Sequence, residues 1–231
     1  NQKNNPQLLY FLGIAYINLG KVEKGIDQLK KSIYFDPKNA SVHINLANAL
    51  KKINCLNDAI VSYDKAIEIN PNYADAYNNK ANTLRDLNQL DDAIISFDKA
   101  IQINPDYFLA YNNRGNVLKD LQRYEEALAS YDKALQIYPN YADAYSNKGN
   151  ILKDLKRFEE SIISCNKAIQ INPDHFFAYN NKGNALKDLQ RYEEALASYD
   201  KALQLNPNYA DIHNNRGTVL QDLKRYEEAV S

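Results

Sequence analysis

Tryptophan and methionine are absent from the 231-residue chain, and cysteine and histidine are scarce. Two cysteines, Cys55 and Cys165, are too few for the disulfide framework of a small secreted domain. The three histidines, His43, His175 and His213, do not stand at metal-ligand spacing. No phosphate-binding glycine loop and no nucleophile elbow occurs. The sequence therefore predicts no catalytic residue, metal site or cofactor, and we expect this chain not to be an enzyme.

An excess of charge of one sign is also lacking. The chain has 28 basic and 29 acidic residues, and its isoelectric point is about 6.4, whereas a nucleic-acid-binding face is usually basic. No apolar run approaches the ~20 residues that span a bilayer, and no signal peptide pattern is present. We expect no nucleic-acid or membrane partner, and a cytoplasmic location is favoured.

The chain does not start with methionine, and it ends within a helical pattern. We therefore expect it to be part of a longer protein. The missing targeting signal consequently says little about that longer protein.

What the chain does contain is a fixed period of 34 residues. Proline recurs at this interval, at Pro37, Pro71, Pro105, Pro139, Pro173 and Pro207. A small residue keeps the same interval, at Gly13, Ala47, Ala81, Gly115, Gly149, Gly183 and Gly217. Such a period is the signature of a stacked repeat protein. With Pro6 as repeat position 1, residues 1–231 form a single array with repeats at 6–39, 40–73, 74–107, 108–141, 142–175 and 176–209, and a partial repeat at 210–231.

Each repeat carries two stretches with the apolar spacing of a helix. In the fourth repeat these stretches cover about 109–121 and 124–137. The short turn between them makes the two helices antiparallel neighbours. The residue before each proline is disfavoured in the helical conformation, which ends the second helix there. The sequence thus predicts an all-α solenoid of helix–turn–helix repeats.

The repeated pattern resembles the tetratricopeptide repeat. In the fourth repeat the residues that carry the resemblance are Tyr111, Gly115, Leu118, Ala127, Tyr131, Ala134 and Pro139. The resemblance implies a right-handed superhelix whose first helices line the inner, concave surface. The family's leucine before the glycine is here basic from the third repeat on, and we expect these side chains to extend from the packed seam to solvent: Lys80, Arg114, Lys148, Lys182 and Arg216.

The first repeat departs from its siblings. Gly25 and Ser32 replace the usual alanines, and Tyr10, Phe11 and Ile14 replace mostly polar residues. A terminal repeat that is more apolar than the others makes a poor solvating cap. We expect it to pack against an upstream segment or against a partner chain, so that a homo-oligomer through the exposed array ends is one prediction.

One set of polar residues has no evident role in stacking. We call it the asparagine row: repeat positions 6 and 9 of the first helices, which are Asn45, Asn79, Asn113, Asn147, Asn181 and Asn215, and Asn48, Asn82, Asn116, Asn150 and Asn184. Positions three apart share one helix face. Each asparagine costs about 0.5 kcal/mol relative to alanine in a helix interior. That cost calls for a compensating role.

The first interpretation of the asparagine row is ligand binding. An asparagine amide can bond the N–H and C=O of a peptide group together, so the row would bind an extended backbone in the groove. The array is most similar to the tetratricopeptide superhelix of O-linked N-acetylglucosamine transferases, which implies such a role. Position 2 adds apolar side chains in alternate repeats, Leu109 and Phe177. The second interpretation is that the asparagines bond one another or the helix ends of the neighbouring repeat.

Three functions remain open from the sequence. The leading prediction is a non-catalytic scaffold that binds an extended segment of a partner protein along the asparagine row. A second is the substrate-recognition arm of a larger enzyme, most plausibly a glycosyltransferase. A third is a self-assembling repeat array.

Overall fold

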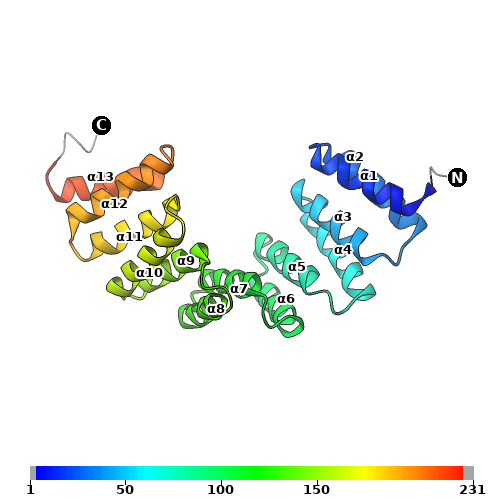
Figure 1. Ribbon diagram of the computed structural model, residues 1–231, viewed down its shortest axis with the longest axis horizontal. Coiled ribbons are helices and arrows are strands. Elements are labelled where there is room, and N and C mark those ends of the chain that lie inside the picture. The colour runs from blue at the N-terminus through cyan, green and yellow to red at the C-terminus, as the bar shows by residue number, and fades with distance from the viewer. Residues whose placement is uncertain (1–3, 226–231) are drawn as a thin grey trace. The chain divides into compact units, whose positions relative to one another are not determined.

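The computed structural model describes residues 4–225, and within that range it consists of α-helices joined by short turns, with no strand (Figure 1). The helix bounds are α1 Pro6–Asn18, α2 Val22–Phe35, α3 Ala40–Lys52, α4 Leu56–Ile69, α5 Ala74–Asp86, α6 Leu90–Ile103, α7 Phe108–Asp120, α8 Tyr124–Ile137, α9 Ala142–Asp154, α10 Phe158–Ile171, α11 Phe176–Asp188, α12 Tyr192–Leu205 and α13 Ala210–Asp222. The expected helices of the fourth repeat are confirmed, the first of them one residue earlier than predicted.

The chain forms two compact units, Asn1–Val117 and Leu118–Ser231. Within the first unit, α1 packs on α2, α3 on α4 and α5 on α6, while α2 packs on α3 and α4 on α5. The second unit repeats this arrangement from α8 to α13. Within each unit, successive helices therefore pack on one another, as in the all-α solenoid that the period predicts.

The core of each unit is built from one large side chain per repeat and the small residues around it. Tyr63, Phe97, Tyr131 and Tyr199 occupy the same repeat position and are fully buried. The backbone of the first helix lies close to this position. A Cβ added at Gly183 would stand 2.6 Å from the Tyr199 ring, too close for any larger residue without a shift. The small residues thus allow the two helices of a repeat to approach each other closely.

The turns use two different devices. As predicted, the second helices end at the residue before proline, which is extended at Asn70, Asn104 and Asn172. The first helices are followed, one residue past the C-cap, by a residue with positive φ: Gly20, Asn54, Asn88, Gln122, Lys156, Gln190 and Lys224. This left-handed residue closes the helix end. Glutamine and lysine rarely adopt it, so the sequence did not reveal this turn.

The basic residues of the seam do reach solvent, and most form an ion pair there. Lys80 binds Asp64 and Lys148 binds Asp132, each at 2.6 Å. Arg114–Asp98 and Arg216–Asp200 repeat the contact. In every case the aspartate belongs to the second helix of the preceding repeat. Since all these pairs are partly exposed, each contributes modestly, on the order of 0–1 kcal/mol.

Histidines and cysteines, which are few in this chain, have structural roles. His43 and His213 each bond a proline carbonyl in the preceding turn, at 3.0 and 2.7 Å. Cys165 is fully buried at the large-residue position, and Cys55 is half-buried at the start of α4. Among residues 4–225, no helix has both the length and the apolar character that crossing a membrane requires.

Candidate functional site

The asparagine row lies on a face of the first helices that remains open to solvent. Positions 2, 6, 9 and 13 fall within about 60° of one another around a helix that turns ~100° per residue. We call these four positions the first-helix face. In α9 they are Asp143, Asn147, Asn150 and Asp154. The two aspartates are exposed and the two asparagines are half-buried, so the row is accessible from outside.

Within each unit, position 6 asparagines bond to the preceding repeat. Asn113 Nδ2 donates to Asn78 Oδ1 at 3.3 Å, and Asn215 Nδ2 donates to Asn180 Oδ1 at 3.2 Å. Asn181 Nδ2 lies 3.2 Å from both the carbonyl and the hydroxyl oxygen of Ser146. The acceptors all occupy position 5 of the preceding repeat. These bonds fix the orientation of the position 6 amides.

Position 9 is held by the second helix of its own repeat. The Tyr63 hydroxyl donates to Asn48 Oδ1, and the Tyr199 hydroxyl donates to Asn184 Oδ1 at 2.7 Å. Phe97 and Cys165 carry no hydroxyl at the corresponding place, so Asn82 and Asn150 lack this bond. The phenol therefore orients the position 9 amide in some repeats and not in others.

Part of the second interpretation is thus confirmed, because the asparagines do bond one another. In the first unit, Asn78 Nδ2 donates to Asn79 Oδ1 at 3.1 Å, and Asn79 Nδ2 lies 3.5 Å from Asn48 Oδ1. Hydrogen bonds therefore orient several amides of the row in each unit: Asn48, Asn79 and Asn113 in the first, and Asn181, Asn184 and Asn215 in the second. An amide has two N–H donors and an acceptor oxygen with two lone pairs, which exceeds what one inter-repeat bond consumes.

Position 2 alternates between an anchored acid and an apolar side chain. Tyr107 donates its hydroxyl to Asp75, and His175 Nε2 lies 3.0 Å from Asp143 Oδ1. His175 Nδ1 accepts the Ala178 N–H, so the hydrogen on Nε2 is the one directed at Asp143. This hydrogen bond holds the pKa of the Asp143 carboxyl below its usual value. Asp143 is consequently an ionised carboxylate at neutral pH.

The apolar members of position 2, Leu109 and Phe177, are exposed. The Phe177 ring contacts Phe176 at 4.0 Å and Tyr209 at 5.6 Å between ring centroids. Packing of this kind holds an aromatic ring in one place at the surface. Each unit therefore pairs one anchored aspartate with one apolar side chain in the following repeat.

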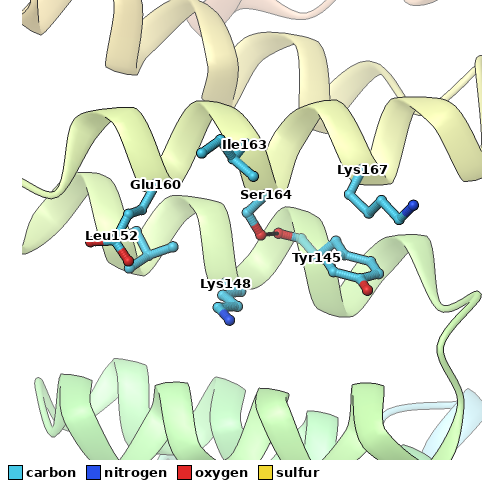
Figure 2. A pocket seen from close by; sticks show the side chains of 7 residues that line it. All are labelled: Tyr145, Lys148, Leu152, Glu160, Ile163, Ser164 and Lys167. Carbon is cyan, nitrogen blue, oxygen red and sulfur yellow. Dashed lines mark hydrogen bonds between the residues drawn. The ribbon is translucent and has the colours of Figure 1, made fainter.

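A pocket of about 400 Å³ lies elsewhere, between α9 and α10 (Figure 2). It is lined by Tyr145, Lys148 and Leu152 of α9, which stand on the side of the helix opposite to the asparagines, and by Glu160, Ile163, Ser164 and Lys167 of α10. Ser164 Oγ donates to the Tyr145 carbonyl at 2.8 Å across it. A similar pocket recurs one repeat later. The described residues contain no group of three acidic, histidine or cysteine side chains that would bind a metal.

The sequence interpretation missed the position 5 acceptors, Asn78, Ser146 and Asn180. A signal was present, because each acceptor stands 35 residues before the position 6 asparagine that it binds. Each phenol partner of position 9 stands 15 residues after its asparagine. Neither interval matches the period of a single helix, and for that reason neither stood out.

Two solved structures are similar to this chain in fold. The crystal structure of YrrB, described as a tetratricopeptide repeat protein with an unusual peptide-binding site, is 26% identical, covers 80% of this chain and 95% of its own, and has a TM-score of 0.63. A tetratricopeptide repeat protein from Parabacteroides merdae is 19% identical, with 97% and 88% coverage and a TM-score of 0.81. The second likeness shows the fold alone.

Sequence models of the family locate the repeats independently. Models described as tetratricopeptide repeat match residues 6–39, 40–73, 62–95, 108–141, 142–175 and 164–197. A further model described as TPR repeat matches 81–122 and 183–224. A comparison with curated proteins found no match. Since the matched segments together run from residue 6 to residue 224, the chain belongs to the tetratricopeptide repeat family.

Proposed function

We propose that the array is a non-catalytic scaffold that binds an extended polypeptide segment along the first-helix face. The observation that carries the proposal is the set of half-buried amides at positions 6 and 9, several of which hydrogen bonds already orient in each unit. A peptide backbone presents one N–H and one C=O per residue, and an asparagine amide matches both. Because the amides are already oriented, a ligand has less ordering entropy to overcome.

The alternation at position 2 specifies what the segment should contain. Consecutive first helices pack against each other in each unit, and packed helices are about 8–10 Å apart. An extended chain rises about 3.3 Å per residue, so about three ligand residues span one repeat. Asp143 favours a basic ligand side chain, and Phe177 in the next repeat favours an apolar or aromatic one. We propose a ligand segment in which a basic residue and an apolar or aromatic residue stand about three positions apart.

The likeness to YrrB supports a peptide ligand, since that protein is described as having a peptide-binding site and is 26% identical. It does not specify the ligand of this chain. The class of ligand is inferred from the amides at positions 6 and 9 and from the side chains at position 2.

The proposal predicts that removing the amides abolishes peptide binding. Peptides selected by this protein from a phage-displayed library of unstructured sequences would be titrated against the variant with Asn147→Ala, Asn181→Ala and Asn215→Ala. We expect an affinity loss of at least about 5-fold, because two or three hydrogen bonds of roughly 0.5–1.5 kcal/mol each are removed. Circular dichroism should show an unchanged helix content, since alanine favours the helix.

A matched control carries Ile163→Ala and Lys167→Ala, which alter the opposite side of the same unit. It should bind the selected peptides as the unchanged protein does. If the asparagine variant binds equally well, or if no peptide is selected at all, the asparagines serve the stack alone and the proposal is wrong.

The charge at position 2 gives a second prediction. Asp143→Asn keeps an acceptor for His175 but removes the charge. Selected peptides that contain lysine or arginine should bind several-fold more weakly to it, and the remaining affinity should depend less on salt. Asp132→Asn removes the same charge from an ion pair with Lys148 on the other side and should leave the salt dependence unchanged. Equal effects of the two variants would refute a basic contact at Asp143.

A further inference from the structure

The groove between the two helices of a repeat forms a pocket at the same place in two successive repeats of the second unit. One is the pocket of Figure 2, and the other, of about 390 Å³, lies between α11 and α12. We call the latter the α11–α12 pocket. Its lining residues occupy repeat positions that also line the first pocket: Tyr179, Lys182, Glu194, Ala197, Ser198 and Lys201. On a helix that turns ~100° per residue, Tyr179 and Lys182 point away from the asparagine row, so the pocket is separate from the proposed peptide site.

Lys182 is a basic residue of the seam that lacks the usual ion-pair partner. In four other repeats the basic side chain at this position pairs with an aspartate 16 residues earlier: Lys80–Asp64, Arg114–Asp98, Lys148–Asp132 and Arg216–Asp200. The residue 16 positions before Lys182 is Asn166, which carries no charge. None of the ion pairs formed among residues 4–225 includes Lys182, although this side chain is half-buried. Burying a charge costs free energy unless a partner of opposite charge compensates for it.

The other charges of the α11–α12 pocket leave it with an excess of positive charge. Lys201 donates to the neutral Gln204 at 3.4 Å, and it too takes part in no ion pair within the described part of the chain. Glu194 is the acidic residue among the lining side chains, but Arg191 donates to both of its oxygens at 2.7 Å. The charge of Glu194 is therefore already compensated, and two ammonium groups line the pocket without a carboxylate of their own.

We propose that the α11–α12 pocket binds a small organic anion, namely a phosphate monoester with an aromatic body. A phosphate monoester carries a charge of about −1.5 to −2 at neutral pH, which matches Lys182 and Lys201 together, whereas a single carboxylate matches only one of them. Tyr179 adds an aromatic ring to the wall of the pocket, and aromatic rings pack favourably on one another. The volume of about 390 Å³ is that of a pocket for a small molecule.

Isothermal titration calorimetry of the 231-residue protein with phenyl phosphate tests the proposal. The unchanged protein should bind one phenyl phosphate per chain, and it should bind inorganic phosphate more weakly because that ion lacks the ring. Asn166→Asp supplies the aspartate that the other repeats place next to their basic residue, so Lys182 is then paired. Binding should become at least about 10-fold weaker, since a hydrogen bond between two charged groups is lost. Helix content by circular dichroism should stay the same, because aspartate already occupies this repeat position at Asp132 and Asp200.

The matched control is Asn57→Asp, which adds the same charge at an exposed position of α4 where later repeats carry Asp91 or Glu125. It should bind phenyl phosphate as the unchanged protein does. The proposal is overturned if the unchanged protein binds no phenyl phosphate at millimolar concentrations, or if Asn166→Asp binds it equally tightly. Equal losses in Asn166→Asp and Asn57→Asp would also overturn it, because the effect would then come from the net charge of the chain. Inorganic phosphate bound as tightly as phenyl phosphate would refute the contact with the Tyr179 ring.

Discussion

Replacing Tyr199 by alanine should lower the free energy of unfolding by about 3–5 kcal/mol, the usual cost of deleting a fully buried aromatic side chain. The ring is buried completely and packs over Gly183 in α11. Deleting it leaves a cavity between α11 and α12 that the surrounding helices cannot fill without moving. Urea denaturation followed by circular dichroism measures the change as a shift of the transition midpoint.

Tyr199→Phe separates the ring from its hydroxyl. It should cost only about 1 kcal/mol, the net value of one hydrogen bond, because it removes the bond to Asn184 and keeps the packing. Phe97 is the natural example of this arrangement. If the two substitutions lower the free energy of unfolding equally, then the hydrogen bond of Tyr199 stabilises the fold and the packing of its ring does not.

Thiol modification should distinguish the two cysteines by about a thousandfold in rate at pH 8. Burial raises the pKa of the Cys165 thiol to about 12, against an ordinary value of about 8.5. Only the thiolate reacts, so a raised pKa lowers the reactive fraction at every pH below it. Cys55 is half-buried at the start of α4 and accessible to reagent. A chromogenic disulfide reagent would report one fast and one very slow thiol.

The sign of the pH dependence follows from the same shift. As pH rises from 8 toward 12, the rate at Cys165 should keep increasing, while a thiol with an ordinary pKa levels off near pH 9–10. The Cys165→Ser variant, which keeps Cys55, should lose the slow phase alone. Two equally fast thiols in the folded protein would contradict the burial of Cys165.

Much of the fold was predictable because its cause is local and repeated. The prolines set where second helices end, and the residues before them are extended as expected. The small residues set how closely the helices approach, as Gly183 illustrates. Cys165 stands in register with Tyr131 and Tyr199 and is buried in the core as they are. Equivalent positions of stacked repeats have nearly the same neighbours, so the burial of a residue can be predicted from its repeat position.

The candidate site was predictable only in part. The asparagine row was visible in the sequence, and its accessibility on the first helices agrees with the structure. Its hydrogen-bond partners were not visible in the sequence, because a bond such as that from Asn113 to Asn78 joins the first helices of two successive repeats. Whether the remaining amide groups bind a peptide stays a prediction.

By itself, then, the sequence determined the helices, their antiparallel pairing and the residues of the core, because 34-residue periodicity and steric fit act within one repeat and its neighbour. Only the tertiary structure decided which polar groups bond to one another. Asn113 and Asn181 occupy the same repeat position, yet the first donates to the Asn78 side chain and the second to the carbonyl and hydroxyl oxygens of Ser146. That difference depends on which groups of the neighbouring first helix lie within reach, and the pattern of a single helix does not record it.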